Sequence, residues 1–179
     1  MSDPPTRPVT SPRPGTSPGR RAAAWRPWLA TALRLVLAGV LGVAGAVKLP
    51  DPAESVRAVR AYQLLPEAVV PAVGYGLPLL ELVLAVLLLL GLLTRAAAVL
   101  SALLLAAFVA GILAAAARGL SIDCGCFGGG GTVDPSDTRY TAEIVRDTAL
   151  LVAAAVLARW PASRFALDHH HTPDQEDPS

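Results

Sequence analysis

One uninterrupted apolar stretch constrains the fold of this chain more than any other feature. No charged residue occurs between Ala96 and Ala117, and roughly 20 apolar residues are enough to cross a bilayer as a helix. Two further stretches of similar length, Trp28 to Val47 and Val69 to Leu93, carry one charged residue each, Arg34 and Glu81. The sequence therefore predicts a polytopic membrane protein.

A fourth segment, Tyr140 to Trp160, is the weakest candidate span. Its first turns carry Glu143, Arg146 and Asp147, so a re-entrant or buried helix is the alternative interpretation. Trp160 followed by Pro161 is nevertheless typical of a stop at the membrane interface. We therefore expect an all-α protein, a four-transmembrane-helix bundle with disordered termini.

The overall composition is that of a membrane protein. Hydrophobic residues make up 53% of the chain and charged residues 16%, and the mean hydropathy is +0.50. With a formal net charge of +1, the chain offers no basic groove for a nucleic acid. The lipid bilayer is the expected surrounding, and a nucleic-acid partner is not.

The two ends of the chain differ from its middle. Residues 1–27 are rich in Pro, Arg, Ser and Thr, and residues 161–179 are polar. Such segments cannot bury a core and are expected to be disordered, which places the membrane domain at residues 28–160. A cleaved signal peptide is the alternative for the first apolar segment, but that segment exceeds the roughly 7–15 apolar residues usual for a signal.

A short amphipathic helix is expected between the first two spans. Asp51 is a good N-cap, Pro52 suits the first helical position, and Glu54 can complete a capping box. Apolar residues then recur at three-residue spacing until the helix ends near Pro66. Such a helix is expected to lie on the membrane surface or over the bundle.

The basic residues predict the orientation of a four-span bundle. Seven arginines lie near the span ends on the side of the termini, against five basic residues on the other side. Because cytoplasmic loops carry an excess of Lys and Arg, both termini are expected in the cytoplasm of a bacterial-type plasma membrane. The first group is Arg13, Arg20, Arg21, Arg26, Arg95, Arg159 and Arg164, and the second is Lys48, Arg57, Arg60, Arg118 and Arg139.

The only two cysteines, Cys124 and Cys126, lie in the loop after the third span, with Gly125 between them. The predicted orientation puts this loop outside the cytoplasm, where disulfides persist. A bridge across one residue closes a small, strained ring, and strained disulfides tend to be the labile or catalytic ones. We therefore expect Cys124 and Cys126 to be the catalytic pair of a redox site.

Two alternatives for the cysteine loop remain open, an inert turn and a metal site. The metal site is the weaker interpretation, and no metal ligand is assigned, because a closed zinc site needs four ligands and one chain offers Cys124, Cys126 and Asp123. A dimer could supply four. For thiol chemistry the thiolate is the reactive form. Arg118 and Arg139 bracket the loop and would favour a thiolate, whereas Asp123 would oppose it.

Glu81 is the deepest charge of the predicted spans, and its candidate partners are Arg34 and Lys48. Ionisable groups inside a membrane are costly and often functional. The three residues are therefore candidates for quinone binding or proton handling, and the alternative is an ion pair that holds the bundle in register. Glu143, Arg146 and Asp147 share one helical face on the side of the cysteines.

Four motifs resemble the MauE (methylamine utilisation protein E) family, a branch of the DoxX-like integral membrane proteins. The resemblance covers about residues 30–160, and the cysteine motif is its most specific part. The motifs are Gly45-Ala46-Val47-Lys48-Leu49, Tyr62-Gln63-Leu64-Leu65-Pro66, Pro78-Leu79-Leu80-Glu81-Leu82 and Ile122-Asp123-Cys124-Gly125-Cys126-Phe127-Gly128.

This resemblance implies a four-helix membrane bundle that helps to mature an extracytoplasmic redox enzyme by disulfide formation with a thioredoxin-like partner. DoxX-like relatives are linked to quinone-coupled thiol or sulfur oxidation, so a membrane quinone is the implied cofactor. The family name implies a link to methylamine metabolism.

The sequence thus predicts a membrane thiol–disulfide redox protein that acts in maturation of, or electron transfer for, an extracytoplasmic redox enzyme. Cys124 and Cys126 would exchange with a thioredoxin-like or client redox protein, and electrons would pass to a quinone or another protein. Since there is no second cysteine pair, the acceptor must be contacted directly, which leaves open whether the chain is an enzyme by itself. The alternatives are a non-enzymatic assembly or metal-binding subunit and a small transporter using Glu81.

Overall fold

The computed structural model describes residues 18–161. Over these residues the chain forms five α-helices, one short 3-10 helix and a small two-stranded sheet. The elements are α1 (Pro18–Lys48), α2 (Pro52–Ala61), α3 (Val70–Leu90), α4 (Thr94–Ala117), β1 (Ile122–Asp123), β2 (Gly131–Thr132), η1 (Pro135–Asp137) and α5 (Tyr140–Arg159).

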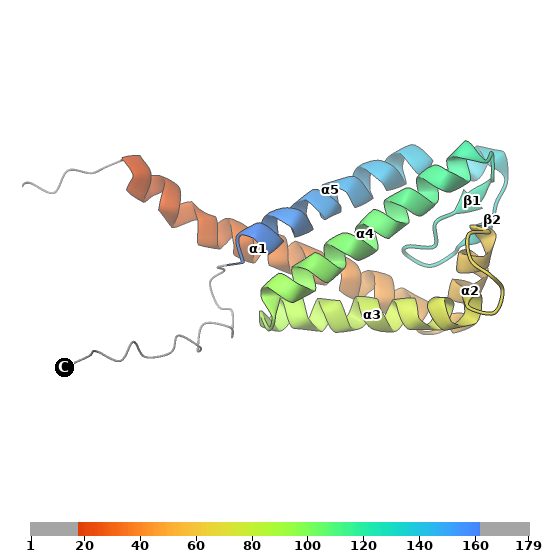
Figure 1. The fold of residues 1–179 in the computed structure, drawn as a ribbon, viewed down its shortest axis with the longest axis horizontal. Helices are drawn as coiled ribbons and strands as arrows, with labels where there is room; N and C mark the ends of the chain where they lie inside the picture. Colours follow the sequence, from red (N-terminus) through yellow and green to blue (C-terminus); the bar gives the residue numbers. More distant parts are fainter. Residues whose placement is uncertain (1–17, 162–179) are drawn as a thin grey trace, which may run out of the picture.

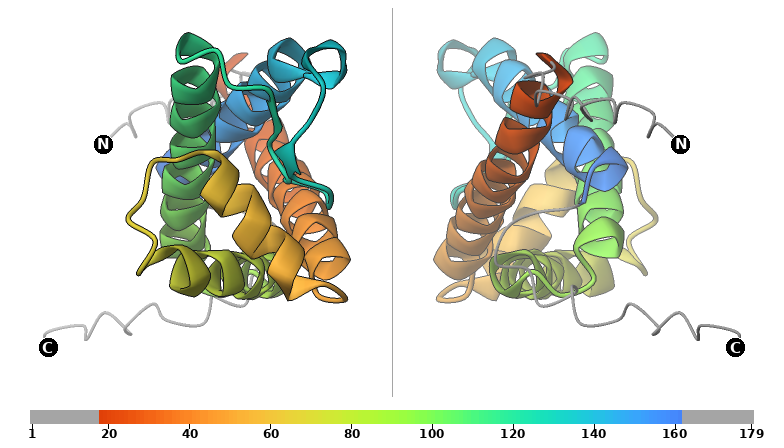
Figure 2. Two further views of the ribbon diagram at one scale, coloured as in Figure 1. Left: turned by 90° about the vertical axis from the view of Figure 1, so that its right-hand side faces the viewer. Right: turned by 90° about the vertical axis from the view of Figure 1, so that its left-hand side faces the viewer.

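The four long helices run side by side, and α1 packs mainly on α3 while α4 packs mainly on α5. Figure 1 shows that α2, the two strands and the start of α5 gather at one end of the bundle. The α3–α4 turn and the end of α5 lie at the opposite end. Cys124 and Cys126 lie between β1 and β2. We therefore call the end of the bundle that holds α2, the two strands and the start of α5 the cysteine end. Figure 2 shows α2 crossing this end of the molecule.

Close helix contacts arise where α1 presents a glycine to α3. A Cβ added at Gly45 would lie 2.8 Å from Leu82 Cγ and 2.9 Å from the Pro78 carbonyl oxygen. The bundle core next to this contact consists of leucines and alanines, including the fully buried Leu37 and Leu88. Small residues let helix backbones approach each other, which is how membrane bundles pack.

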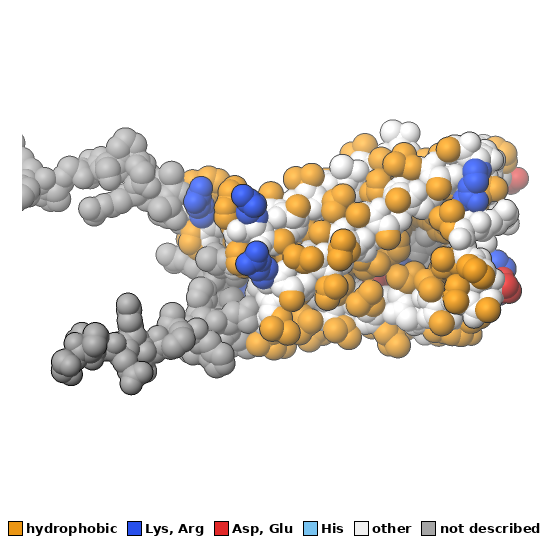
Figure 3. All heavy atoms as spheres, viewed as in Figure 1, with side chains coloured by type: hydrophobic (Ala, Val, Ile, Leu, Met, Phe, Trp, Pro, Cys, Tyr) orange, Lys and Arg blue, Asp and Glu red, His pale blue; other side chains and the backbone are white. Residues whose placement is uncertain are grey.

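The outer face of the bundle is strongly apolar. Large side chains such as Leu79, Val83, Leu89 and Leu103 are more than half exposed, and Figure 3 shows hydrophobic atoms along the helices. Within the described residues, three helical stretches are long and apolar enough to cross a membrane: Trp25–Lys48, Val70–Leu90 and Thr94–Ala117. An apolar surface this extensive marks a lipid-facing exterior, so the chain has the character of an integral membrane protein.

The fourth expected span forms the helix α5, which is long enough but is not among these three. Its first turns carry the three charges noted above, of which Glu143 and Asp147 are buried. At its far end, the guanidinium carbon of Arg26 lies 5.1 Å from the centroid of the Trp160 ring. The end of α5 therefore lies beside the N-terminal part of α1.

Two helix boundaries bear on the expectations from sequence. The Asp51 side chain accepts a hydrogen bond from the Glu54 amide at 3.2 Å, which confirms the cap of α2. The helix α1 begins at Pro18, whereas the disordered tail was expected to extend to residue 27. Pro at a first helical position and a run of alanines both favour a helix, which accounts for the helical residues from Pro18 onward. Residues 1–17 and 162–179, where the rest of the expected tails falls, lie outside the described part.

Candidate functional site

The cysteine loop is a short hairpin that packs directly on α2. Ile122 pairs with Thr132 and Asp123 with Gly131, in antiparallel register. A Cβ added at Gly125 or Gly130 would lie 2.9 or 2.6 Å from the Cβ of Ala58. Both glycines also have positive φ angles, of 69° and 101°, which side chains disfavour. Glycine is therefore required at both positions to let the loop approach α2.

Polar contacts fix the loop to the surrounding helices. The Tyr62 hydroxyl donates to the Cys124 carbonyl at 3.4 Å, and burial raises the pKa of Tyr62, so the phenol stays a neutral donor. The Tyr140 hydroxyl accepts from the Ile122 amide at 3.0 Å and donates to the Leu120 carbonyl. Arg118 donates to the carbonyls of Gln63 and Tyr62. The ends of α2, α4 and α5 thus hold the hairpin.

Both cysteines are free thiols in this structure, and they differ in exposure. Cys124 is half-buried, whereas Cys126 is buried, with 7% of its surface exposed. The Cys126 amide donates to the Cys124 sulfur at 3.3 Å. The two side chains therefore belong to one site, in which a partner reaches Cys124 more easily than Cys126.

Two neighbouring residues of α5 contact the two sulfurs separately. Arg146 Nη2 lies 3.7 Å from Cys124 Sγ, and Asp147 Oδ2 lies 4.0 Å from Cys126 Sγ. Arg146 Nε also donates to Asp147 Oδ1 at 2.8 Å, and its guanidinium carbon lies 4.8 Å from the centroid of the Phe127 ring. Arg146, Asp147 and the two cysteines thus form one polar cluster at the start of α5.

The environment pushes the pKa values of the two thiols in opposite directions. Hydrogen bonding with Cys126 lowers the pKa of Cys124, and Arg146 acts in the same direction, although burial opposes both. The contact with Cys124 raises the pKa of Cys126, and burial and the nearby Asp147 carboxylate raise it further. The surroundings therefore favour a thiolate, which is the nucleophilic form, at Cys124 over one at Cys126.

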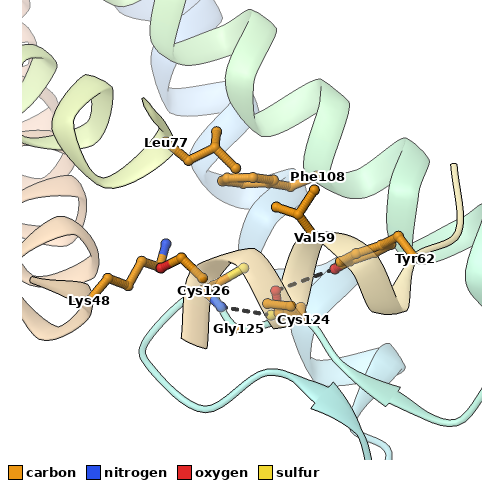
Figure 4. A pocket seen from close by; sticks show the side chains of 10 residues that line it. Lys48, Val59, Tyr62, Leu77, Phe108, Cys124, Gly125 and Cys126 are labelled. Carbon is orange, nitrogen blue, oxygen red and sulfur yellow. Dashed lines mark hydrogen bonds between the residues drawn. The ribbon is translucent and has the colours of Figure 1, made fainter. Parts of the chain in front are cut away.

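A small cavity of about 40 Å³ lies beside the cysteines. Figure 4 shows Cys124 and Cys126 on one side of it and Leu77 and Phe108 on the other. Its walls come from α2, α3, α4, the end of α1 and the cysteine loop. Residues that line it include Lys48, Tyr62, Leu77, Phe108, Cys124 and Cys126. The walls are mainly apolar, and the cavity lies between the two thiols and the packed ends of the helices.

Lys48 and Glu81 form a buried ion pair beside this cavity. Lys48 Nζ lies 2.7 and 2.9 Å from the two carboxylate oxygens of Glu81, and Glu81 is 1% exposed. Lys48 Nζ also lies 6.0 Å from the centroid of the Phe108 ring. Of the two partners expected for Glu81, the structure brings Lys48 to it.

Arg34 is buried in α1, away from the cavity. It precedes Lys48 by 14 residues in the same helix, a separation of about 21 Å along the axis at 1.5 Å per residue. Cys124, Cys126, Lys48 and Glu81 therefore lie around one region of the molecule, and Arg34 does not.

The structure differs from the sequence analysis in the cation that contacts the thiols. Arg118 and Arg139 were expected to favour a thiolate, but Arg118 binds backbone carbonyls and Arg146 contacts Cys124. The i, i+3, i+4 spacing of Glu143, Arg146 and Asp147 did indicate a shared face. What the spacing could not indicate is that the cysteine hairpin folds back onto that face.

A group of possible metal ligands also occurs here. One donor atom each of Asp123, Cys124 and Glu143 lie within 4.8 Å of one another, and Glu143 Oε2 is buried without a hydrogen-bond partner among the described residues. A closed zinc site needs four ligands, and the Arg146 guanidinium already faces the Cys124 sulfur. Arg146 competes with a cation for this sulfur, and only three donors are grouped, so the set fits a closed zinc site poorly.

Comparison with known proteins assigns this arrangement to a family. A search of curated proteins and of solved structures finds no match to the chain. The family model described as methylamine utilisation protein MauE matches residues 26–160. This range contains all the long helices from Arg26 onward, the cysteine hairpin and the Lys48–Glu81 pair, and it covers most of the chain. The chain therefore belongs to the MauE family of methylamine utilisation proteins.

Proposed function

We propose that the protein is a membrane thiol–disulfide redox protein that matures, or exchanges electrons with, an extracytoplasmic redox enzyme of methylamine utilisation. The main support for this proposal is that the two thiols differ in exposure and contact different residues of α5. Cys124 is accessible and has Arg146 beside it, while Cys126 is buried within reach of the same residue pair in α5. Such an asymmetric pair is suited to disulfide exchange.

The exchange with a partner balances as a two-electron reaction. A thiolate of the partner attacks one sulfur of the Cys124–Cys126 disulfide, which forms a mixed disulfide and releases the other sulfur. The second thiol of the partner then attacks the mixed disulfide. The partner leaves with its own disulfide, and Cys124 and Cys126 are left reduced. A thioredoxin-like protein or the client enzyme itself is the partner of suitable chemistry.

Reoxidation of the two thiols requires an acceptor for two electrons and two protons. A membrane quinone would supply this chemistry, and it becomes the quinol in the process. We place the acceptor at the mouth of the cavity that both cysteines and Lys48 line, because its walls are mainly apolar, as a quinone requires. Lys48 and Glu81 would handle protons at the inner wall of that cavity, because they are the charged pair nearest to it within the membrane region.

The proposed topology has four spans, with α5 as the fourth. Its support is the length of α5 and the contact of its far end with Arg26 in α1. In this topology both termini and the α3–α4 turn are cytoplasmic, and the cysteine end faces the oxidising compartment.

Thiol trapping in intact cells tests the proposed function. Cells are treated with a membrane-impermeant alkylating reagent before and after mild reduction, and the modified protein is separated by gel mobility. We expect both cysteines to label only after reduction, and to stay reduced when the quinone pool is depleted. Cysteines that are reduced under every condition would contradict the proposal and favour a non-enzymatic assembly subunit.

The mixed disulfide provides a second arm of this experiment. With Cys126 replaced by Ser, the internal disulfide cannot form, and the Cys124 thiolate can only attack the disulfide of an oxidised partner. The mixed disulfide on Cys124 then persists, because Cys126 is not there to displace the partner. We expect a covalent complex with the partner in the Cys126→Ser strain and much less of it in the Cys124→Ser strain. Equal yields from the two strains would overturn the assignment of Cys124 as the exchanging sulfur.

A further inference from the structure

We infer that Asp147 is a catalytic residue that accepts the proton of Cys126 when the Cys124–Cys126 disulfide closes, and returns it when the disulfide opens. This inference deepens the proposed function, since it names the proton acceptor of the same thiol pair. Arg146 is the positioning residue that joins the Asp147 carboxylate to the Cys124 sulfur.

The geometry divides the two oxygens of Asp147 between two partners. Oδ1 accepts from Arg146 Nε at 2.8 Å, while Oδ2 faces Cys126 Sγ at 4.0 Å. Asp147 is 2% exposed, so bulk water has little access to this carboxylate. Its hydrogen bond with Arg146 fixes the plane of the carboxylate, and the remaining oxygen is directed at the buried thiol.

The exposure of the two sulfurs sets their order of reaction. Cys124 is half-buried and lies before the exposed Phe127, whereas Cys126 is nearly covered. In either direction of the exchange, the sulfur of the partner therefore bonds to Cys124. Cys126 forms or breaks its bond with Cys124 from the buried side. The same Arg146 guanidinium that binds Asp147 lies 3.7 Å from the Cys124 sulfur and stabilises its thiolate.

Closure of the ring requires a base. Cys126 attacks Cys124 in the mixed disulfide, the Cys124–partner bond breaks, and the partner leaves as a thiolate. The Cys126 proton must leave as the new S–S bond forms. In the free dithiol, the contact with Cys124, burial and the Asp147 carboxylate raise the pKa of Cys126, against Arg146. Burial and Asp147 still act in the mixed disulfide, so this thiol keeps its proton until a base accepts it. Asp147 Oδ2, 4.0 Å away, is the acceptor within reach.

Other titratable groups near Cys126 are placed for different tasks. Glu143 and Asp123 have their carboxylates beside Cys124 rather than Cys126. Lys48 lines the same cavity as Cys126, but its ammonium group is bound to both oxygens of Glu81. Tyr62 donates its hydroxyl to the Cys124 carbonyl. Of the titratable groups near Cys126, Asp147 is therefore the one placed to accept its proton.

Glutathione disulfide can test this assignment without knowledge of the natural partner. The reduced full-length protein in detergent is mixed with glutathione disulfide, quenched with acid at successive times, alkylated and analysed by mass spectrometry. In the wild type we expect a transient glutathione adduct on Cys124 that converts rapidly to the closed disulfide. In Asp147→Asn this conversion should slow on the order of 100-fold, the contribution typical of a positioned base, so that the adduct accumulates.

A matched control and a rescue separate proton transfer from a structural effect. Asp137→Asn makes the same substitution at an exposed residue of η1 and should leave the rate of closure unchanged. In Asp147→Ala, added formate should restore part of the rate of closure, because a small carboxylate can replace the missing base, while the same concentration of chloride should not. Rescue by formate is an outcome that a purely structural role of Asp147 would not produce.

Two results would overturn the inference. One is closure at the wild-type rate in Asp147→Asn, and the other is an adduct that accumulates on Cys126 instead of Cys124. The assay is independent of the proposed cellular role, since it uses neither a client nor a quinone. If the cysteines stay reduced in cells while Asp147→Asn still traps the adduct, then the proposed function is wrong and the role of Asp147 stands.

Discussion

Arg146 directs one guanidinium nitrogen at the sulfur of Cys124, at 3.7 Å, from the first half of the helix that follows the cysteine loop. The positive charge and the hydrogen bonding with Cys126 together lower the pKa of Cys124. A lowered pKa means that the thiolate appears at a lower pH than the roughly 8.5 of a free cysteine. We therefore expect these two neighbours to increase the fraction of Cys124 that is thiolate at neutral pH.

Loss of either neighbour should raise the pKa of Cys124 and slow its alkylation at neutral pH. We expect Cys126→Ala to have the larger effect, since hydrogen bonding with the Cys126 side chain is the main cause of the lowered pKa, while the amide hydrogen bond remains in this variant. Arg146→Met should have a smaller effect. A rise of one unit would slow alkylation about tenfold. The measurement is the alkylation rate of Cys124 against pH; a midpoint that does not move upward in either variant would contradict this account.

The Lys48–Glu81 pair gives a second prediction, on stability. Removal of one partner leaves a buried charge, so Lys48→Met or Glu81→Leu should each destabilise the protein by about 3–5 kcal/mol. The double variant replaces the pair with two apolar side chains and should regain most of that stability. Thermal unfolding in detergent checks both statements, and a double variant as unstable as the singles would contradict the second.

The same double variant distinguishes a structural pair from one that handles protons. If Lys48 and Glu81 take part in reoxidation, the stable double variant should lose quinone-dependent recovery of the disulfide, yet still exchange with glutathione disulfide. Wild-type recovery in this variant would assign the pair to helix packing alone.

The contacts of Arg34 and Arg146 could not be predicted from the sequence, because they depend on how distant segments pack. The long apolar runs and the capping residues at Asp51 and Glu54 predicted helices that the structure contains, because these signals are local. The choice of Lys48 over Arg34 depends on how α1 and α3 are aligned, which close contacts such as that of Gly45 with Pro78 and Leu82 define. The contact of Arg146 with Cys124 likewise requires the hairpin to fold back onto α5, and neither relationship is encoded in a local pattern.

The packing of the hairpin on α2 provides a third prediction. Gly130→Ala should open the site, because its new Cβ would lie 2.6 Å from Ala58 Cβ and its φ of 101° is strained for alanine. We expect a loss of about 1–3 kcal/mol and faster alkylation of the buried Cys126 in a Cys124→Ser background.

Gly131 is a matched control for this substitution. Its φ is 120°, but an added Cβ would meet nothing within 4 Å. Gly131→Ala should therefore show the backbone strain without the faster alkylation of Cys126. Ala58→Gly should partly restore the protection of Cys126 in Gly130→Ala. Equal exposure of Cys126 in the two glycine variants would show that contact with Ala58 does not close the site.

The fourth prediction concerns α5 as a membrane span. In a background without Cys124 and Cys126, single cysteines are placed at Ser136 in η1, at Leu93 in the α3–α4 turn and at Arg159 at the end of α5. An impermeant thiol reagent should label the cysteine at position 136 in intact cells, and those at positions 93 and 159 only after the membrane is ruptured. Because Arg159 and Ser136 flank α5, opposite labelling of these two positions requires that α5 crosses the bilayer. Labelling of positions 136 and 159 from the same side would make α5 a re-entrant helix and leave three spans.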